Sequence, residues 1–427
     1  MASCLSHRHC KTIAASDPGN VIISPISVKF LISMLYEGSS GETAKEIEKI
    51  LHLPDEKNYA RMKTSAILRS LQATNQNYVM EIGTKIFVDQ SMTPKNWFQR
   101  ILYLYYNAYI EKLNMTDYKT SIDRINYWVE SVTHGHIKDL ITQDNLNQAM
   151  MLLVNAVYFK GSWESVFQPE ESFDGNFETS NGPKKISYMK QTNYFYYIRS
   201  PDIDAQILRL PYKGDKFSMY IVLPEKENGL EKILKNVSPT DIRKQIMRLD
   251  ETSVEVILPK FKFNYKTDLK PVLKKLGFSK IFDSFGEMKG LVHNNQVKNL
   301  AVSSVIQKAG IEVTEEGSVA AAASEMQLVN KIGIQDELFN ASHPFLFYIE
   351  DVTTDTIVFV GKYVGPETDD SESKIPVKNE EEKEKDEMKK VNSTVISSSI
   401  SNVPTKLHEL KQKKIKSDYR QSYRYRS

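Results

Sequence analysis

The chain has 427 residues, of which 41% are hydrophobic, enough to build one large core or two to three ordinary domains. Its 56 basic and 54 acidic residues leave a formal net charge of +2, which excludes the overall charge excess typical of a polyanion-binding protein. Both cysteines, Cys4 and Cys10, lie near the N-terminus. The body of the chain therefore holds no internal disulfide, and cysteine usage does not separate a secreted from an intracellular protein.

The N-terminal segment, residues 1–18, follows no recognisable pattern. It lacks the uninterrupted apolar core of a secretion signal. His7 and His9 lie between Cys4 and Cys10, but this spacing fits no standard zinc site, so we expect no metal here.

The first elements in chain order are a short β-branched strand and a helix from Pro25, with Ser24 placed as its N-cap. Further patterns predict helices over 38–54, 93–109 and 121–141, and strands over 78–89 and 149–159. The last of these strands is the longest apolar run of the chain. It is too short to span a membrane, so we expect no membrane-spanning segment.

Strand patterns dominate the second half of the chain. Aromatic and branched residues, with turn residues between them, predict strands over 186–198, 206–212, 216–224 and 253–265 and a hairpin over 343–351 and 356–366. One more helix, 268–277, is expected to end at Gly277. Helices early, strands late and no βαβ rhythm indicate an α+β fold.

The composition changes after Pro366. Residues 367–390 carry ten acidic and six basic side chains, and residues 406–427 carry eight Lys and Arg against two acids. Such a segment buries too little apolar surface to fold, so we expect 367–427 to be a disordered charged tail. An alternative is weak polyanion binding by the basic end, where Tyr419, Tyr423 and Tyr425 supply stacking rings. The acidic block is equally able to pair with this basic end and mask it.

Motifs for catalysis and cofactor binding are missing from the sequence. It contains no Gly-rich phosphate loop, His-Glu-x-x-His, Cys-x-x-Cys or Gly-x-Ser-x-Gly motif. His134 and His136 are interpreted as a surface pair rather than metal ligands. We expect neither enzymatic activity nor a cofactor.

Four Asn-x-Ser/Thr sequences are possible N-glycosylation sites. Pro239 directly follows the sequence that begins at Asn236 and weakens it. The remaining candidates are Asn114, Asn340 and Asn392.

The stretch EEGSVAAAASEMQLVNKIG, Glu315 to Gly333, holds four consecutive alanines and no proline. Because Ala is the best helix former, composition alone favours a short helix. Its neighbours along the chain change this interpretation.

Several segments together resemble the serpin family. They are NVIISPISV, GSSGETAKEIEKIL, LLVNAVYFKGSW, LRLPYKGDKFSMYIVLP, VEVILPKFKFNYKTDLKPVLKKLGF, KAGIEVTEEGSVAAAAS, HPFLFYIED and IVFVGKYVGP. They run in the family's order across residues 19–366.

The resemblance implies one serpin domain with three β-sheets, about nine helices and an exposed reactive loop at about 315–340. It also implies a monomer that acts as a suicide substrate: a serine protease forms an ester with the loop, the cleaved loop inserts into the central sheet, and the distorted protease stays covalently trapped.

The hinge of this loop has the composition that insertion requires. The resemblance assigns to it Glu315, Glu316, Gly317, Ser318, Val319, Ala320, Ala321, Ala322, Ala323 and Ser324. Side chains of a strand alternate between two faces. The face that begins Ser318, Ala320, Ala322 is small and uncharged, as a strand entering a packed sheet needs, and no proline interrupts the amides.

The reactive bond is placed by its distance from the hinge. In the family it lies about fourteen to fifteen residues beyond the hinge glycine, which leads from Gly317 to Lys331. We predict cleavage between Lys331 and Ile332 by trypsin-like proteases, whose pocket holds an Asp for the ammonium group. Asn330 is an alternative site, and Met326 and Leu328 are alternatives that would imply chymotrypsin-like or elastase-like targets.

Other residues match the family's controls on sheet opening. Ser24, Ser27 and Asn155 match a polar cluster beneath the central sheet, which the family usually completes with His, whereas this chain has Gln307. Gln both donates and accepts hydrogen bonds but does not titrate. Trp163 matches the Trp at the top of the sheet.

On the helix that binds heparin in some relatives, Arg61, Lys63 and Arg69 are interpreted as a solvated face rather than a binding site.

The sequence departs from the family pattern at both ends. A long first helix is expected before Gly19, where only a short segment stands, and the charged tail exceeds the family's usual end.

We predict a secreted inhibitor of trypsin-like proteases in an extracellular cascade. The alternatives are a non-inhibitory serpin acting as a carrier, storage protein or chaperone, and an intracellular inhibitor.

Overall fold

A computed structural model describes residues 17–54, 56–73, 76–283, 286–293, 300–315 and 336–367. The described residues belong to one compact unit, Met1–Glu367. No helix among them is long and apolar enough to cross a membrane.

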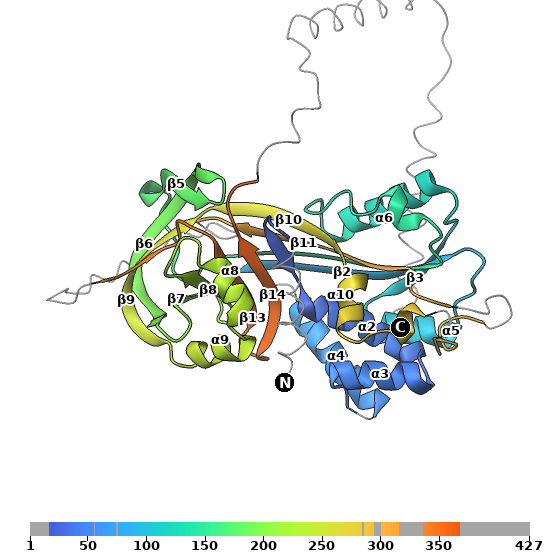
Figure 1. The fold of residues 1–427 in the computed structure, drawn as a ribbon. Coiled ribbons are helices and arrows are strands. Elements are labelled where there is room, and N and C mark those ends of the chain that lie inside the picture. The colour runs from blue at the N-terminus through green and yellow to red at the C-terminus, as the bar shows by residue number, and fades with distance from the viewer. Residues whose placement is uncertain are drawn as a thin grey trace, which may run out of the picture. The chain divides into compact units, whose positions relative to one another are not determined.

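A five-stranded sheet forms the middle of this unit (Figure 1). Its order is β10 (Phe261–Asp268), β11 (Ser304–Val313), β4 (Met151–Gly161), β2 (Tyr78–Asp89) and β3 (Tyr109–Leu113). The predicted strands over 78–89 and 149–159 are thereby confirmed as neighbours in one sheet.

The two faces of the five-stranded sheet are covered by different helices. Figure 1 shows α6 (Tyr118–Val132) on one face and α2 (Pro25–Gly38), α4 (Lys57–Leu71) and α5 (Asn96–Tyr106) on the other. Strand β4 is buried along nearly its whole length because its alternate side chains enter two separate hydrophobic cores. Burial on both faces explains why its sequence is continuously apolar.

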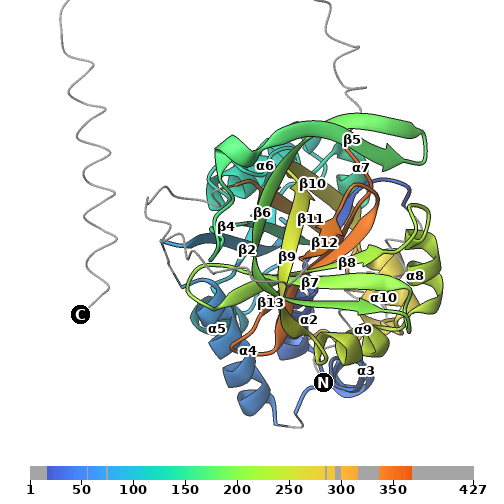
Figure 2. The ribbon, with the colours of Figure 1, turned by 90° about the vertical axis from the view of Figure 1, so that its left-hand side faces the viewer.

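The remaining strands pair into a nine-stranded set, which faces the viewer in Figure 2. Strand β6 (Gly182–Ser200) joins two portions of this set, because it pairs first with β5 and β9 and then, at its end, with β7. The other members are β1 (Val21–Ile23), β5 (Phe173–Thr179), β7 (Ala205–Pro211), β8 (Phe217–Pro224), β9 (Asp250–Pro259), β12 (Glu337–Asn340), β13 (Phe345–Asp351) and β14 (Thr356–Tyr363).

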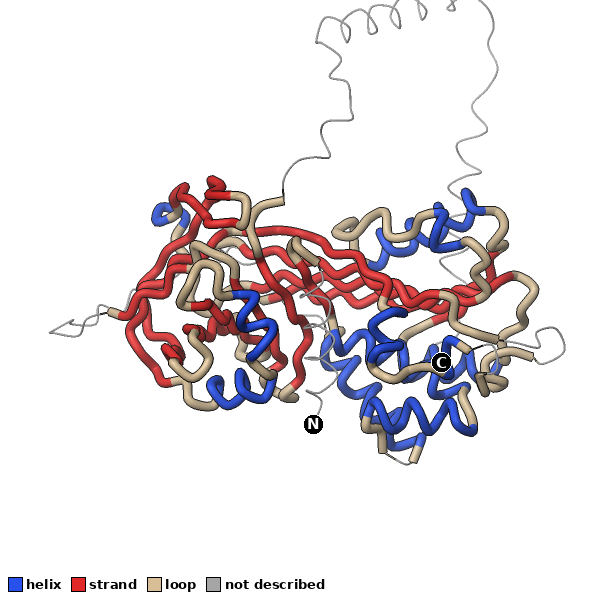
Figure 3. Tube along the Cα trace, viewed as in Figure 1, coloured by secondary structure: helices blue, strands red, loops and turns tan. Residues whose placement is uncertain are grey.

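Shorter helices complete the described part of the chain. Figure 3 shows α8 and α9 beside the strands of the nine-stranded set. Their bounds, with those of the other short elements, are α3 (Gly41–Leu51), α7 (Gln143–Leu146), α8 (Leu230–Asn236), α9 (Pro239–Ile246), α10 (Lys270–Lys275), η1 (Pro169–Glu171) and η2 (Lys280–Phe282). The α+β prediction and the serpin-like architecture are confirmed.

Three local predictions were wrong. The strand expected over 253–265 is two strands, β9 and β10, which break at Lys260 and belong to different sheets. The helix expected over 121–141 ends at Val132, and His134, Gly135 and Asp139 have positive φ angles of 46°, 84° and 50°. The residues that follow α6 therefore form turns rather than helix. Ser24 does precede α2, but its side chain makes no capping hydrogen bond.

Several predicted features lie outside the described residues. They are residues 1–16, the hinge residues 316–324, the reactive bond between Lys331 and Ile332, and the tail from 368 onward with Asn392. Predictions on these residues stay predictions.

Candidate functional site

The candidate site is the seam between β4, the central strand of the five-stranded sheet, and its neighbour β11. They run parallel and pair directly, from Ser304 opposite Leu152 to Ile311 opposite Phe159. Strand β11 leads to Glu315, where the predicted hinge begins. A strand inserted between β4 and β11 would have to replace this pairing.

All four residues of the predicted polar cluster meet at this seam. Gln307 on β11 lies opposite Asn155 on β4, and its Nε2 donates to Asn155 Oδ1 at 2.8 Å. Asn155 Nδ2 donates to the Gly83 carbonyl of β2 at 3.1 Å. The cluster therefore ties together three strands of the sheet.

The start of α2 completes the cluster. The Gln307 amide pairs with the backbone of Ser24: Ser24 N donates to Gln307 Oε1 at 3.0 Å, and Gln307 Nε2 donates to Ser24 O at 3.2 Å. The Ser24 hydroxyl donates to Ser27 Oγ at 2.9 Å instead of capping the helix. The four side chains are fully buried, so separating the strands would expose or orphan these groups.

Trp163 lies at the end of the seam next to the predicted hinge. Its Nε1 donates to the Thr314 carbonyl at 2.9 Å, just beyond β11. Its ring stacks on Tyr212 at a centroid distance of 4.4 Å and is buried. Trp163 thus holds the chain at the point where the predicted hinge begins.

Glu315 is the only residue assigned to the hinge that the structure describes, and it is anchored. Its Oε1 accepts hydrogen bonds from Lys260 Nζ at 2.8 Å and Ser172 Oγ at 2.7 Å, and its carbonyl accepts from Phe167 N at 3.2 Å. Burial favours a raised pKa for the Glu315 carboxyl, but the bonds from Lys260 and Ser172 outweigh burial and lower the pKa.

An ion cluster at the same end of the seam was not predicted from the sequence. Glu312 on β11 pairs with Lys160 on β4 and with Lys262 on β10, the latter at 2.7 Å, and accepts a hydrogen bond from Tyr158 at 3.1 Å. Burial alone would raise the pKa of Glu312, but the two lysines outweigh burial and lower this pKa to about 2. The available signal was a carboxylate in a largely buried strand, because such a group needs partners.

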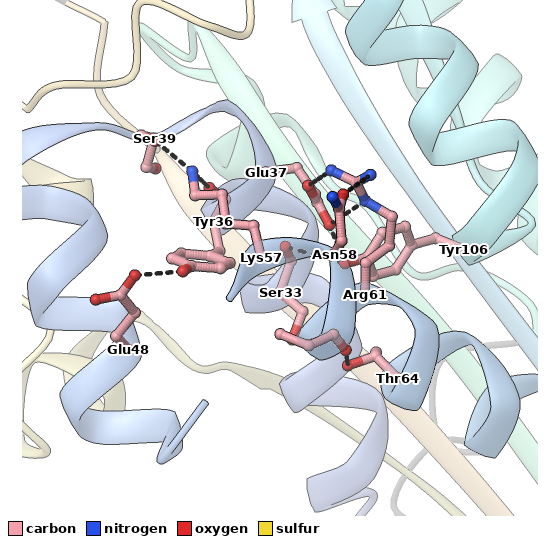
Figure 4. Close-up of polar contacts among 11 residues, drawn as sticks. Ser33, Tyr36, Glu37, Ser39, Glu48, Lys57, Asn58, Arg61, Thr64 and Tyr106 are labelled. Carbon is pink, nitrogen blue, oxygen red and sulfur yellow. Dashed lines mark hydrogen bonds and ion pairs between the residues drawn. The ribbon is translucent and has the colours of Figure 1, made fainter. Parts of the chain in front are cut away.

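The basic residues of α4 do not form a free cationic patch. Arg61 makes a bidentate pair with the buried Glu37 of α2, at 3.0 and 2.7 Å, and Tyr106 donates to the same carboxylate at 2.8 Å (Figure 4). Arg69 lies within 3.4 Å of the Leu104 carbonyl, and Lys63 is exposed. Arg61 therefore joins helices α2, α4 and α5 instead of facing a ligand.

Two of the three candidate glycosylation residues are described, and both are exposed. Asn114 lies in a turn where its side chain accepts hydrogen bonds from Thr116, and Asn340 ends β12. Exposure makes both side chains accessible to modification.

Comparison with known proteins identifies the family. The model of the family described as "Serpin (serine protease inhibitor)" matches residues 3–366. The chain belongs to the serpin family. "Serine protease inhibitor 2" of Anopheles gambiae is 36% identical over 367 residues, covering 83% of this chain and 89% of that protein.

Solved structures agree with this assignment. The crystal structure of Serpin48, described as a highly specific serpin of the insect Tenebrio molitor, superposes with a TM-score of 0.74 at 30% identity, covering 84% of this serpin and 95% of that chain. Human thyroxine-binding globulin, in complex with thyroxine, has a TM-score of 0.76 at 23% identity, covering 86% of this serpin and 100% of that chain. The latter likeness shows the fold alone.

Proposed function

We propose that this serpin inhibits trypsin-like serine proteases by trapping them as a covalent complex. The observation that carries the proposal is the directly paired seam of β4 and β11. The seam is followed along the chain by the predicted hinge, whose face beginning Ser318, Ala320, Ala322 is small and uncharged. The anchored Glu315 and Trp163 hold the chain where an inserting strand would enter. The resemblance to protease inhibitors of insects supports the same function.

The reaction begins at the carbonyl carbon of Lys331. The hydroxyl oxygen of the protease serine attacks this carbon, the bond to the nitrogen of Ile332 breaks, and Ile332 leaves as a protonated amine. Lys331 is then joined to the protease as an ester. If the loop inserts between β4 and β11 before water attacks the ester, the protease stays bound. If water arrives first, the cleaved serpin and active protease separate.

Incubation with trypsin followed by denaturing electrophoresis tests this proposal. We expect a complex that survives SDS, and we expect Lys331→Ala to abolish it while the matched variant Lys226→Ala, at an exposed lysine elsewhere, retains it. Cleavage without a complex and without a gain in heat stability would refute inhibition and favour a carrier, storage or chaperone role. A complex with chymotrypsin or elastase instead would move the reactive bond to Met326 or Leu328.

We also propose that the serpin is secreted, acts in an extracellular cascade as a monomer, and carries glycans. The exposure of Asn114 and Asn340 supports glycosylation. Expression in secretory cells should yield protein in the medium whose mobility increases after removal of N-linked glycans. Retention inside the cell without glycans would support the alternative of an intracellular inhibitor.

Weak polyanion binding by the basic end of the tail is proposed from the tail's composition. Eight Lys and Arg among residues 406–427 would neutralise sulfate or phosphate groups. Removal of residues 406–427 should lower the salt concentration that elutes the protein from heparin. Unchanged elution would contradict this role.

A further inference from the structure

The segment that follows α6, residues 133–141, crosses the seam on the face opposite α2, and we call it the strap. Ile137 and Leu140 of the strap are fully buried in the hydrophobic core that α6 shares with the sheet. Asn126 of α6 fixes the strap's far end, accepting from Ile141 N at 2.8 Å and donating to its carbonyl at 3.1 Å. A strand inserted between β4 and β11 would place side chains under the strap, so the strap has to lift for insertion.

The strap is attached to the strands on both sides of the seam. On one side, His134 Nδ1 lies 2.6 Å from Glu81 Oε1 of β2, and the His136 ring stacks on Tyr158 of β4 with centroids 3.9 Å apart and planes 5° apart. On the other side, Lys308 Nζ of β11 donates to the Lys138 carbonyl at 2.7 Å.

Both histidine contacts strengthen when the ring gains a proton. The Glu81 side chain is only 10% exposed, and its Oε2 is buried with no hydrogen-bond partner among the described residues. A protonated His134 would therefore pair with a carboxylate that has few other partners. A protonated His136 would lie over the face of a tyrosine ring, which attracts cations.

Other titratable groups lie on the strap and on the elements it packs against. They are Glu130 on α6, Lys138 and Asp139 on the strap, Lys160 on β4, Lys262 on β10, and Lys308 and Glu312 on β11, together with the Tyr158 phenol. These carboxylates, amines and phenol belong to classes that ordinarily titrate outside pH 5.5 to 8, whereas the ordinary pKa of histidine, about 6.5, lies within it.

We propose that the strap is a proton-sensitive latch on the seam: protonation of His134 and His136 holds it against β2 and β4 and slows separation of β4 from β11. The latch would act on any strand that inserts at the seam. Its effect on protease inhibition rests on the proposed function, because there the inserting strand is the serpin's own cleaved loop. During inhibition, a slower insertion would let water release more protease, so the latch would make inhibition less efficient in acid.

The test uses the intact serpin without a protease. A synthetic peptide of residues 318–329 is added, and its insertion is followed by the gain in heat stability. From about pH 8 to about pH 5.5 we expect the insertion rate to fall roughly threefold to tenfold, as contacts of this strength allow. The double variant His134→Gln with His136→Gln should lose this dependence, whereas His293→Gln, at an exposed histidine on another segment, should retain it.

A second variant separates the latch from general damage to the fold. Glu81→Gln keeps a hydrogen-bond acceptor for His134 but removes the charge, so it should reduce the pH dependence and leave the rate at about pH 8 close to the parent's. An insertion rate that does not fall in acid, a double variant with the parent's pH dependence, or a sheet that accepts no peptide would overturn the proposal. If trypsin forms no covalent complex but peptide insertion shows the expected pH dependence, the proposed function fails and the latch stands.

Discussion

Gln307 is a fully buried polar side chain in a row of strand β11 that is otherwise apolar. Val305, Ala309 and Ile311 occupy the same face and belong to the main hydrophobic core. The amide is stable there because its oxygen and its nitrogen are both hydrogen-bonded, to Ser24 and Asn155. Since Gln does not titrate, this cluster closes the seam without a pH-dependent member.

Replacing Gln307 with Leu should strongly destabilise the folded serpin. The change leaves Ser24 N and Asn155 Oδ1 buried without their partner, at about 1–3 kcal/mol each. We expect the free energy of unfolding to fall by about 2–5 kcal/mol in chemical denaturation. The control Gln90→Leu, at an exposed position, should stay close to the parent. A loss below about 0.5 kcal/mol for Gln307→Leu would show that the seam tolerates an apolar replacement.

The Glu312 cluster should make stability depend on pH in the acid range. The folded-state pKa of about 2 lies below the ordinary value of 4.5, so the ionised form is favoured by folding. The stabilisation is complete above about pH 4.5 and is lost as the pH falls toward 2. Glu312→Gln should flatten this part of the stability profile, by about 1 kcal/mol after screening by solvent is considered. An unchanged profile in denaturation measurements between these pH values would contradict the assignment.

At the scale of elements, the seam leads directly to Glu315, the first residue assigned to the hinge. Strand β11 pairs with β4 along its length, and Trp163 and Glu315 hold the chain directly beyond it. A strand that enters this seam would alternate its side chains between the two faces of the sheet. In the hinge sequence the face of Ala322 carries no charge, whereas the face of Ala321 also carries Glu325. The face on which a hinge residue lies therefore predicts how strongly a substitution of that residue slows insertion.

Ala322→Arg should convert the inhibitor toward a substrate. Ala322 belongs to the small, uncharged face predicted to enter the packed sheet, and burying a charged side chain there slows insertion. We expect at least a tenfold loss of SDS-stable complex with trypsin while cleavage of the loop continues. Ala321→Arg, on the other face, is the matched control and should lose less. Equal losses from both variants would show that the predicted alternation is wrong.

At the scale of the whole molecule, the described core is contained within Met1–Glu367, and the charged tail predicted from composition follows it along the chain. A chain that ends at Glu367 should therefore unfold at the same temperature as the full chain and form complexes with trypsin at the same rate. Calorimetry and electrophoresis measure both. A lower unfolding temperature would show that the tail contributes to the stability of the serpin domain.

Much of the fold was accessible from local patterns. The run 149–159 was predicted as a buried strand, and the structure places this strand at Met151–Gly161. The hairpin predicted over 343–351 and 356–366 is found as Phe345–Asp351 paired with Thr356–Tyr363. Both were accessible because burial and turn chemistry leave periodic signals. The end of α6 was missed, since the apolar residues Ile137 and Leu140 continue a helix-like spacing although they pack in turns. Helices α8 and α9 also escaped prediction, because their surface-facing residues weaken the periodic signal. Helix α4 was placed only through the family resemblance.

The sequence by itself determined the family, the cluster residues Ser24, Ser27, Asn155 and Gln307, and the composition of the hinge. Only the tertiary structure decided that Glu312 reaches Lys160 across the seam, that Arg61 is paired with Glu37, and that the strap contacts strands on both sides of the seam. The physical reason is separation along the chain. Helix and strand patterns repeat every few residues, whereas Lys160 and Glu312 are 152 residues apart and meet only because β4 and β11 pair in one register.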